Sequence, residues 1–237
     1  MSPETASSPA RPLVVAVEGI DGAGKTHVAR LLAERLRARG FRVGILDRRD
    51  ARFGNAFADS RLDLLRAAIW PQQPEPAEDV LGTHFSLFLL AAWFAALNRL
   101  VMAAAQPCDV LVTDGTYFRV VAKAHLRSSL PIEWLQSLFE NALQPDCISL
   151  LDVDPAQAWG RRPSFKATEV GRWDGFSGDP EQAFVHYQGK VRGVLLTLAA
   201  ERGWAVVRQP ASSDAESVCS AVEESLRARL TGVSTGG

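Results

Sequence analysis

Short apolar runs alternate along the chain with longer segments in which apolar residues recur every three or four positions. Five runs have the length and composition of buried strands: residues 13–17, 41–46, 110–113, 147–153 and 204–207. The helical spacing covers residues 26–39, 56–69, 78–105, 132–143, 180–202 and 214–230, and a short helix opens at Asp154-Pro155. Strands that alternate with helices favour an α/β fold in three layers, with a parallel five-stranded sheet and helices on both faces.

Length and composition fit one large domain. The chain has 237 residues, of which 47% are hydrophobic and 22% charged, so it can bury a sizeable core. We expect one domain over residues 12–230, a disordered tail rich in Ser, Pro and Ala at 1–11, and a flexible tail at 231–237. The 26 basic and 27 acidic residues nearly balance, which gives no global electrostatic reason for a nucleic-acid polymer or a membrane as partner.

The sequence favours a cytoplasmic protein. The longest uncharged apolar run, residues 85–97, is too short for a membrane span and predicts a buried helix. The first twelve residues lack the apolar centre of a signal peptide. The three cysteines, Cys108, Cys147 and Cys219, lie far apart without Cys-x-x-Cys spacing, so we expect reduced thiols.

The segment between the first strand and the first helix has the pattern of a phosphate-binding loop. It reads Gly19-Ile20-Asp21-Gly22-Ala23-Gly24-Lys25-Thr26 and matches G-x-x-x-x-G-K-[ST] at every fixed position. Its glycines let backbone N–H groups turn toward a phosphate, and the following helix adds the positive end of its dipole. Lys25 is expected to reach the β- and γ-phosphates of ATP, and Thr26 to place its hydroxyl on Mg²⁺.

Acidic residues lie beside this loop. Asp114 ends the third strand and therefore faces the same edge of the sheet, where it can bind Mg²⁺ through water or orient an acceptor hydroxyl. Glu18 and Asp21 bracket the turn, and Asp21 is the stronger candidate for a contact with metal or with a sugar hydroxyl. Glu18 could instead bind Lys25 or a backbone amide.

A segment rich in glycine and charge, at about residues 160–178, interrupts the helical pattern. It contains Arg161, Arg162 and Arg172. We expect it to close as a lid that excludes water and completes the charge clamp around the phosphates, and an ordinary solvated loop is the alternative.

These motifs together resemble the thymidylate kinase family of P-loop nucleoside monophosphate kinases. The segment from Glu18 to Thr26 is similar to that family's form of the loop, which has an acidic residue inside it. The likeness extends at modest similarity over residues 13–230 and includes the segments 151–155, 184–199 and 204–207. The resemblance implies a P-loop kinase that transfers the γ-phosphoryl group of Mg·ATP to a nucleotide or nucleoside, and a homodimer as one oligomeric state.

The same resemblance implies that Arg161, Arg162 or Arg172 comes from the lid and stabilises charge on the transferring phosphoryl group. Arg161 and Arg172 therefore join Lys25, Asp21 and Asp114 as catalytic candidates.

The resemblance also implies an acceptor site. Arg49 follows the second strand where the family has Arg-Glu-Pro and would meet the acceptor phosphate, with Arg48 as a rival. Asp114 and Tyr117 fall in the family's Asp-Arg-Tyr/His motif. Phe88 begins the stretch that corresponds to the family's thymine-reading Phe-Ala-Ala-Asp-Arg.

Two arginines of the family pattern are missing from this sequence. Gly115 stands at the arginine of Asp-Arg-Tyr, for which Arg49 or Arg119 could compensate, and residues 88–94 contain no arginine to pair with a base. A site that reads a base edge loses selectivity when its donor disappears, which argues against dTMP as the acceptor. The alternatives are a kinase for the hydroxyl of a non-nucleotide metabolite and a regulatory NTPase switch, although the Asn-Lys-x-Asp segment of switch GTPases is absent from the sequence.

Overall fold

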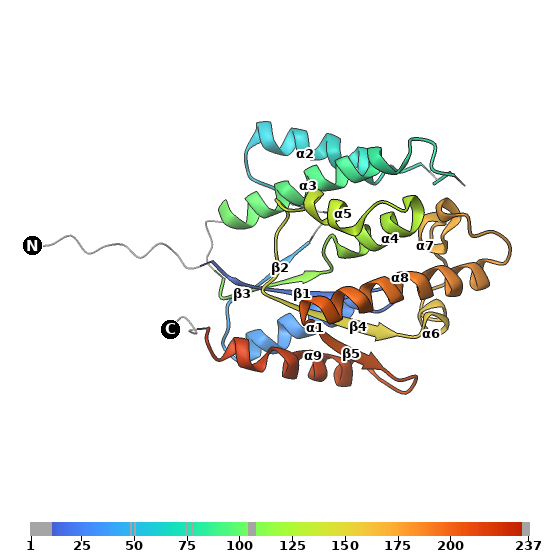
Figure 1. The fold of residues 1–237 in the computed structure, drawn as a ribbon. Coiled ribbons are helices and arrows are strands. Elements are labelled where there is room, and N and C mark those ends of the chain that lie inside the picture. Colours follow the sequence, from blue (N-terminus) through green and yellow to red (C-terminus); the bar gives the residue numbers. More distant parts are fainter. Residues whose placement is uncertain are drawn as a thin grey trace, which may run out of the picture.

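A five-stranded parallel sheet forms the centre of the molecule (Figure 1). The structure is a computed structural model, and it describes residues 11–47, 49, 51–73, 75–76, 78–103 and 108–233. The strands are β1 (Leu13–Gly19), β2 (Val43–Leu46), β3 (Val110–Asp114), β4 (Cys147–Val153) and β5 (Ala205–Gln209). Their order in the sheet is β2-β3-β1-β4-β5, and all pairs are parallel.

Helices cover both faces of this sheet, so the predicted three-layer α/β fold is confirmed. Figure 1 shows α1 and α9 on one side and α2, α3, α4 and α5 on the other, and α8 packs on α4. The helices are α1 (Lys25–Ala38), α2 (Ala56–Ile69), α3 (Thr83–Ala103), α4 (Phe118–Ser128), α5 (Ile132–Leu138), α6 (Pro155–Trp159), α7 (Ala167–Val170), α8 (Pro180–Arg202) and α9 (Ala215–Leu230), with the 3-10 turn η1 (Arg172–Asp174).

The central position of β1 determines where the phosphate-binding loop lies. β1 pairs with β3 and β4, which place Asp114 opposite Val17 and Leu151 opposite Gly19. A strand with neighbours on both edges and helices on both faces is largely apolar, and β1 is buried from Val14 onward, with Glu18 as its one charged residue. The chain therefore leaves β1 at the carboxyl edge of the sheet, where ligands of open α/β sheets bind.

Helix α3 differs from its prediction in length and burial. It begins at Thr83 rather than at residue 78, and residues 104–107 at its predicted end lie outside the described part. The expectation that it is mostly buried was wrong, because Leu87, Trp93, Phe94 and Leu97 are its buried residues and its other faces are partly or fully exposed. By length and composition α3 could cross a membrane, the one such helix among the described residues, which is weak evidence because core helices pass the same test.

The bounds of β1, β2, β3, β5, α1 and α9 differ from the predicted ones by one or two residues at one or both ends, and the other differences concern short helices and the tails. Helix α4 was not predicted, α5 ends at Leu138 rather than at residue 143, and the predicted lid contains α7 and η1. The predicted tails fall largely on residues 1–10 and 234–237, which the structure does not describe. Helices α2 and α8 and strand β4 have the predicted bounds.

Two glycines of the lid segment allow a matched test of its packing. Gly171 and Gly175 have nearly the same left-handed backbone, with φ of +83° and +81°. A Cβ on Gly171 would lie 2.6 Å from Cγ of the buried Tyr187, whereas a Cβ on Gly175 meets nothing within 4 Å. We expect Gly175→Ala to lower the free energy of unfolding by about 1–2 kcal/mol through backbone strain, and Gly171→Ala to lower it by about 1–3 kcal/mol more. Urea denaturation measures both, and equal losses would contradict this packing.

Candidate functional site

The phosphate-binding loop takes a conformation that favours glycine. Gly22 and Gly24 have φ of +78° and +88°. A Cβ on Gly22 would lie only 2.7 Å from the carbonyl oxygen of Ala158. Helix α1 begins at Lys25, directly after the loop, so the loop amides and the positive end of the helix dipole point to one place. This is the geometry of an anion site at a helix N-terminus.

Lys25 is turned into the loop. Its side chain is almost buried, with 7% exposure, and Nζ donates to the carbonyl oxygens of Gly19 (3.0 Å) and Ile20 (2.7 Å). Burial, and next the Arg119 guanidinium, lower the pKa of Lys25 to about 7, although Asp21 and other carboxylates act in the opposite direction. The ammonium group therefore lies where the loop amides would hold phosphates, and its charge is sensitive to what binds there.

Thr26 and Asp114 meet across the gap between α1 and β3. The Thr26 hydroxyl donates a hydrogen bond to the Asp114 carboxylate. Mg²⁺ in phosphate sites takes oxygen ligands, with one or two from the protein and the rest from phosphates and water. A hydroxyl and a carboxylate held side by side at the loop fit this requirement, so the two residues named from the sequence for Mg²⁺ lie together.

Glu18 joins the end of β1 to the turn after β3. It is fully buried, and its carboxylate accepts hydrogen bonds from the backbone N–H and hydroxyl of Thr116 (2.7 Å for the hydroxyl) and from the N–H of Gly19 (3.2 Å). Gly115 has φ of +80°, which lets the chain turn sharply between Asp114 and Thr116. The sequence suggested Lys25 or a backbone amide as the partner of Glu18, and in the structure Glu18 accepts from the backbone amides of Thr116 and Gly19.

Asp21 is buried between two cations. Its carboxylate lies 3.0 Å from a guanidinium nitrogen of Arg119 and 2.7 Å from Nζ of Lys123, and Nε2 of Gln188 donates to it at 3.2 Å. Burial raises the pKa of Asp21, but the attraction of Arg119 and Lys123 outweighs it, so the pKa is well below its usual range and the group is ionised. Gln188 also accepts from the Asp21 N–H at 3.2 Å, so α4 and α8 both hold this part of the loop.

A cavity of about 490 Å³ adjoins Asp21. Residues from α2, α3 and α4, from the segment before α3 and from the lid line it. Most of the wall is apolar and includes Ile69, Trp70, Leu87, Leu90, Trp93 and Phe94. The charged lining includes Asp21, Arg49, Arg119, Lys123 and Arg127. The cavity therefore combines an apolar wall with a charged end at the phosphate-binding loop.

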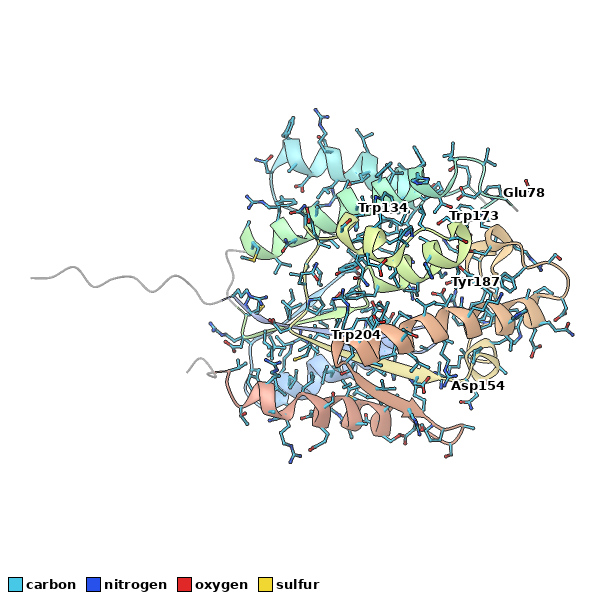
Figure 2. All side chains as sticks on the ribbon, viewed as in Figure 1. Glu78, Trp134, Asp154, Trp173, Tyr187 and Trp204 are labelled. Atoms are coloured by element: carbon cyan, nitrogen blue, oxygen red, sulfur yellow. The ribbon has the colours of Figure 1, made fainter. Side chains whose placement is uncertain are left out.

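The segment before α3 and the lid are joined at the edge of this cavity. The backbone N–H and the hydroxyl of Thr168 donate to the Glu75 carboxylate at 3.1 and 3.0 Å. The indole N–H of Trp173 donates to the carbonyl oxygen of Pro76 at 2.8 Å. Figure 2 shows Trp173 at the end of the molecule where Glu78 also lies. Two segments about ninety residues apart in sequence thus close one side of the cavity.

The lid arginines have different partners. Arg161 donates to the carbonyl oxygen of Ala23 at 3.1 Å, so it lies at the phosphate-binding loop, and burial lowers its pKa. Arg172 donates to two backbone carbonyls of the lid segment itself, at 3.0 and 2.9 Å. Arg162 forms an ion pair with Glu169. Of the predicted candidates, the structure brings Arg161 to the loop, whereas Arg172 stabilises the lid.

The three residues predicted to bind the acceptor lie in different surroundings. Arg49 lines the cavity, with its guanidinium carbon 6.0 Å from the centre of the Trp70 ring, and its rival Arg48 is outside the described residues. Phe88 is 54% exposed and is not part of the cavity wall, because successive helix positions point about 100° apart and its neighbours on α3 face inward. Tyr117 is buried in the core with its hydroxyl 2.9 Å from Oε1 of Gln144. Phe88 and Tyr117 therefore do not line this cavity.

Sequence reasoning missed Lys123 and Gln188 and mentioned Arg119 only as a substitute for a missing arginine. The available signal was the spacing of Arg119, Lys123 and Arg127, which are four residues apart and lie on one face of α4. Gln188 gives no local signal, because its partner Asp21 is 167 residues away in the sequence. A helix assignment for residues 118–128 would have placed the three basic side chains together.

Comparison with known proteins agrees with this geometry. The sequence profile of a family described as "Thymidylate kinase" matches residues 17–208. The chain belongs to the thymidylate kinase family. Similar proteins include a "Probable thymidylate kinase" of Archaeoglobus fulgidus, 31% identical over 63% of this chain and 68% of that protein, and one of Thermococcus kodakarensis, 30% identical over 65% and 73%. A "Thymidylate kinase" of Xanthomonas oryzae pv. oryzae is 29% identical over 63% of this chain and 60% of that protein.

Membership of the thymidylate kinase family confirms the resemblance inferred from the sequence. It also confirms that the chain is a phosphotransferase. The family implies the use of ATP and a small nucleotide as phosphoryl acceptor.

The low pKa of Lys25 predicts proton uptake when nucleotide binds. Below about pH 6 the free lysine is already charged, whereas above about pH 7 most of it is neutral. Phosphates favour the charged form and raise its pKa, so binding of Mg·ATP between about pH 7 and 9 should take up nearly one proton. Isothermal titration calorimetry in two buffers of different ionisation enthalpy counts the protons. Equal uptake by wild type and Lys25→Met would assign the proton to another group.

The buried Glu18 predicts a large effect of an isosteric substitution. In Glu18→Gln one carboxylate oxygen becomes an NH2 group, which faces either the donors of Thr116 or the N–H of Gly19, so a buried hydrogen bond is lost and two donors face each other. We expect the free energy of unfolding to fall by about 1–3 kcal/mol, measured by urea denaturation. The exposed Glu34 on α1 provides the control, since Glu34→Gln should change stability by less than about 0.5 kcal/mol. Similar losses in both variants would contradict this role of Glu18.

Proposed function

We propose that this member of the thymidylate kinase family transfers the γ-phosphoryl group of Mg·ATP to a nucleotide or nucleoside held in the 490 Å³ cavity. The observation that carries the proposal is the position of Asp21, which belongs to the phosphate-binding loop and also lines the cavity. The donor phosphates and the acceptor would therefore meet at one side chain. Such adjacency is the main requirement of phosphoryl transfer, where catalysis is largely positioning and electrostatic stabilisation.

The residues of the loop would hold the donor. Backbone amides of residues 22–26 and the Lys25 ammonium group would bind the phosphates, and Thr26 and Asp114 would hold Mg²⁺. When bound, Mg²⁺ neutralises charge on the phosphate oxygens. Arg161, already at the loop, would add positive charge where it develops on the transferring group.

The lid would exclude water from the transfer. Residues 160–178 already contact the segment before α3 through Thr168 and Trp173. Opening of these contacts would admit the acceptor, and their closure would keep water from competing as phosphoryl acceptor. Arg172, bonded to carbonyls within the lid, would preserve its shape during this motion.

The apolar wall of the cavity affects which nucleotide base the site can accept. The side chains of α3 that line the cavity are uncharged, among them Leu87, Leu90 and Trp93. An aromatic wall holds a ring by packing, whereas discrimination between bases requires donors and acceptors aimed at the base edge. We therefore expect weak selectivity among bases and no strong preference for dTMP.

A panel of acceptors tests the function directly. Mg·ATP and Mg·GTP are offered with dTMP, the other deoxynucleoside monophosphates, the matching nucleosides and non-nucleotide alcohols. We expect transfer to several nucleotides with kcat/KM values within roughly tenfold of one another. Lys25→Met should reduce transfer by about 100-fold or more, with a normal circular dichroism spectrum.

The panel also separates the alternatives. Transfer confined to a non-nucleotide alcohol would contradict the proposal and favour a retargeted kinase. Slow hydrolysis with no transfer to any acceptor would favour a regulatory switch. A preference for dTMP above about 100-fold would contradict only the inference from the apolar wall.

A further inference from the structure

A stripe of three cations on α4 faces the cavity. Arg119, Lys123 and Arg127 are spaced by four residues, so they share one helix face, and all three line the cavity. Arg127 contacts two carboxylates, those of Asp79 (3.3 Å) and Asp174 (3.1 Å). Arg127 therefore has two carboxylate partners, whereas Arg119 and Lys123 share a single carboxylate, that of Asp21.

Arg119 and Lys123 lie in a largely buried place. Their side chains are 21% and 17% exposed, and that of Asp21 is 7% exposed. At such burial water screens charges poorly, so an additional anion beside the two cations gains more than it would at the surface. Lys123 also donates to the carbonyl oxygen of Thr168 at 3.1 Å, and this neutral acceptor helps to fix its position.

Other carboxylates also act on this cluster. Burial lowers the pKa of Arg119, but the attraction of Asp21, and next of Glu18, Asp114 and Glu169, outweighs it and raises the pKa. Glu18 is held by Thr116 and the Gly19 amide, and Glu169 pairs with Arg162. Arg119 and Lys123 both line the cavity, where an anion supplied from outside the chain can reach them.

We propose that Arg119 and Lys123 are the residues that bind the phosphate of the acceptor and make this enzyme select a phosphate ester over a free nucleoside. The inference rests on the proposed function. Without acceptor, Asp21 holds the two cations in place. With acceptor bound, a phosphate dianion shares them, and a guanidinium and an ammonium group give it fixed, charge-assisted hydrogen bonds.

The position of this anion site fits the reaction. Asp21 lies in the phosphate-binding loop, so a phosphate on Arg119 and Lys123 borders the donor phosphates. An oxygen of the acceptor dianion attacks the γ-phosphorus of ATP, the bond to the β,γ-bridging oxygen breaks, and ADP leaves with that electron pair. No proton has to move, and the product is a nucleoside diphosphate.

The local backbone explains why these two residues supply the charge. Gly115 has no side chain, and its left-handed backbone lets Thr116 reach Glu18. The Thr116 side chain bonds to Glu18, and the Tyr117 side chain lies in the core. Arg119 is the first residue after Asp114 whose charged side chain reaches the cavity, and Lys123 follows one helical turn later.

Calorimetric titration tests the proposal without relying on turnover. The phosphate-binding loop is first saturated with Mg²⁺ and a non-hydrolysable ATP analogue, so that added phosphate groups cannot bind there. The titrants are deoxynucleoside monophosphates and the matching nucleosides. We expect wild type to bind each monophosphate at least about tenfold more tightly than its nucleoside. Arg119→Gln and Lys123→Gln should each weaken monophosphate binding roughly 10- to 100-fold and nucleoside binding by less than about threefold.

The matched control is Lys190→Gln, which removes an exposed cation from α8 and should leave both affinities unchanged. Equal effects of Arg119→Gln on monophosphate and nucleoside, or no effect beyond that of Lys190→Gln, would overturn the proposal. Equal affinity of wild type for both ligand classes would overturn it even where the variants fail to fold. Failure of the ATP analogue to bind would instead contradict the proposed function, so the two failures are distinguishable.

Discussion

The ion pairs of Asp21 with Arg119 and Lys123 are the interaction on which the site depends. Removing a carboxylate from water costs several kcal/mol, so Asp21 can stay buried and ionised only while both cations remain close. Because Asp21 is part of the phosphate-binding loop and the cations belong to α4, the donor loop and the acceptor cavity are held as one unit. A shift of α4 would leave a buried charge without its partner.

A second buried acid supports this arrangement from the sheet. Glu18 joins the end of β1 to the turn after β3 through Thr116, and this turn leads directly into α4. The parallel pairing of β1 with β3 brings the two segments together, and the carboxylate fixes their spacing. Asp114 is thereby held next to Thr26, so the metal-binding oxygens depend on the same contact.

Local patterns explain which parts of the molecule could be predicted. The loop from Gly19 to Thr26 is defined by eight consecutive residues. The strands are recognised from their apolar runs, and the long helix α8 from the spacing of its apolar residues. The cluster around Asp21 needs partners 98 or more residues away, which no single segment reveals. Phe88 and Tyr117 were misplaced for the same reason, because the rotation of α3 and the packing of α4 decide which side chains face the cavity.

The site has two halves that are built differently, a donor half formed by the phosphate-binding loop and an acceptor half formed by the cavity. The donor half is a short continuous segment whose backbone geometry tolerates little change, as the close approach of Gly22 to Ala158 shows. The acceptor half is assembled from several distant segments, and its contacts are made by side chains. The chain has Gly115 at a position where the family pattern has an arginine, and Arg119 lies in the first turn of the next helix, while the sequence of the loop still matches the phosphate-binding pattern. Within one family, ATP use can stay constant while recognition of the acceptor is rebuilt.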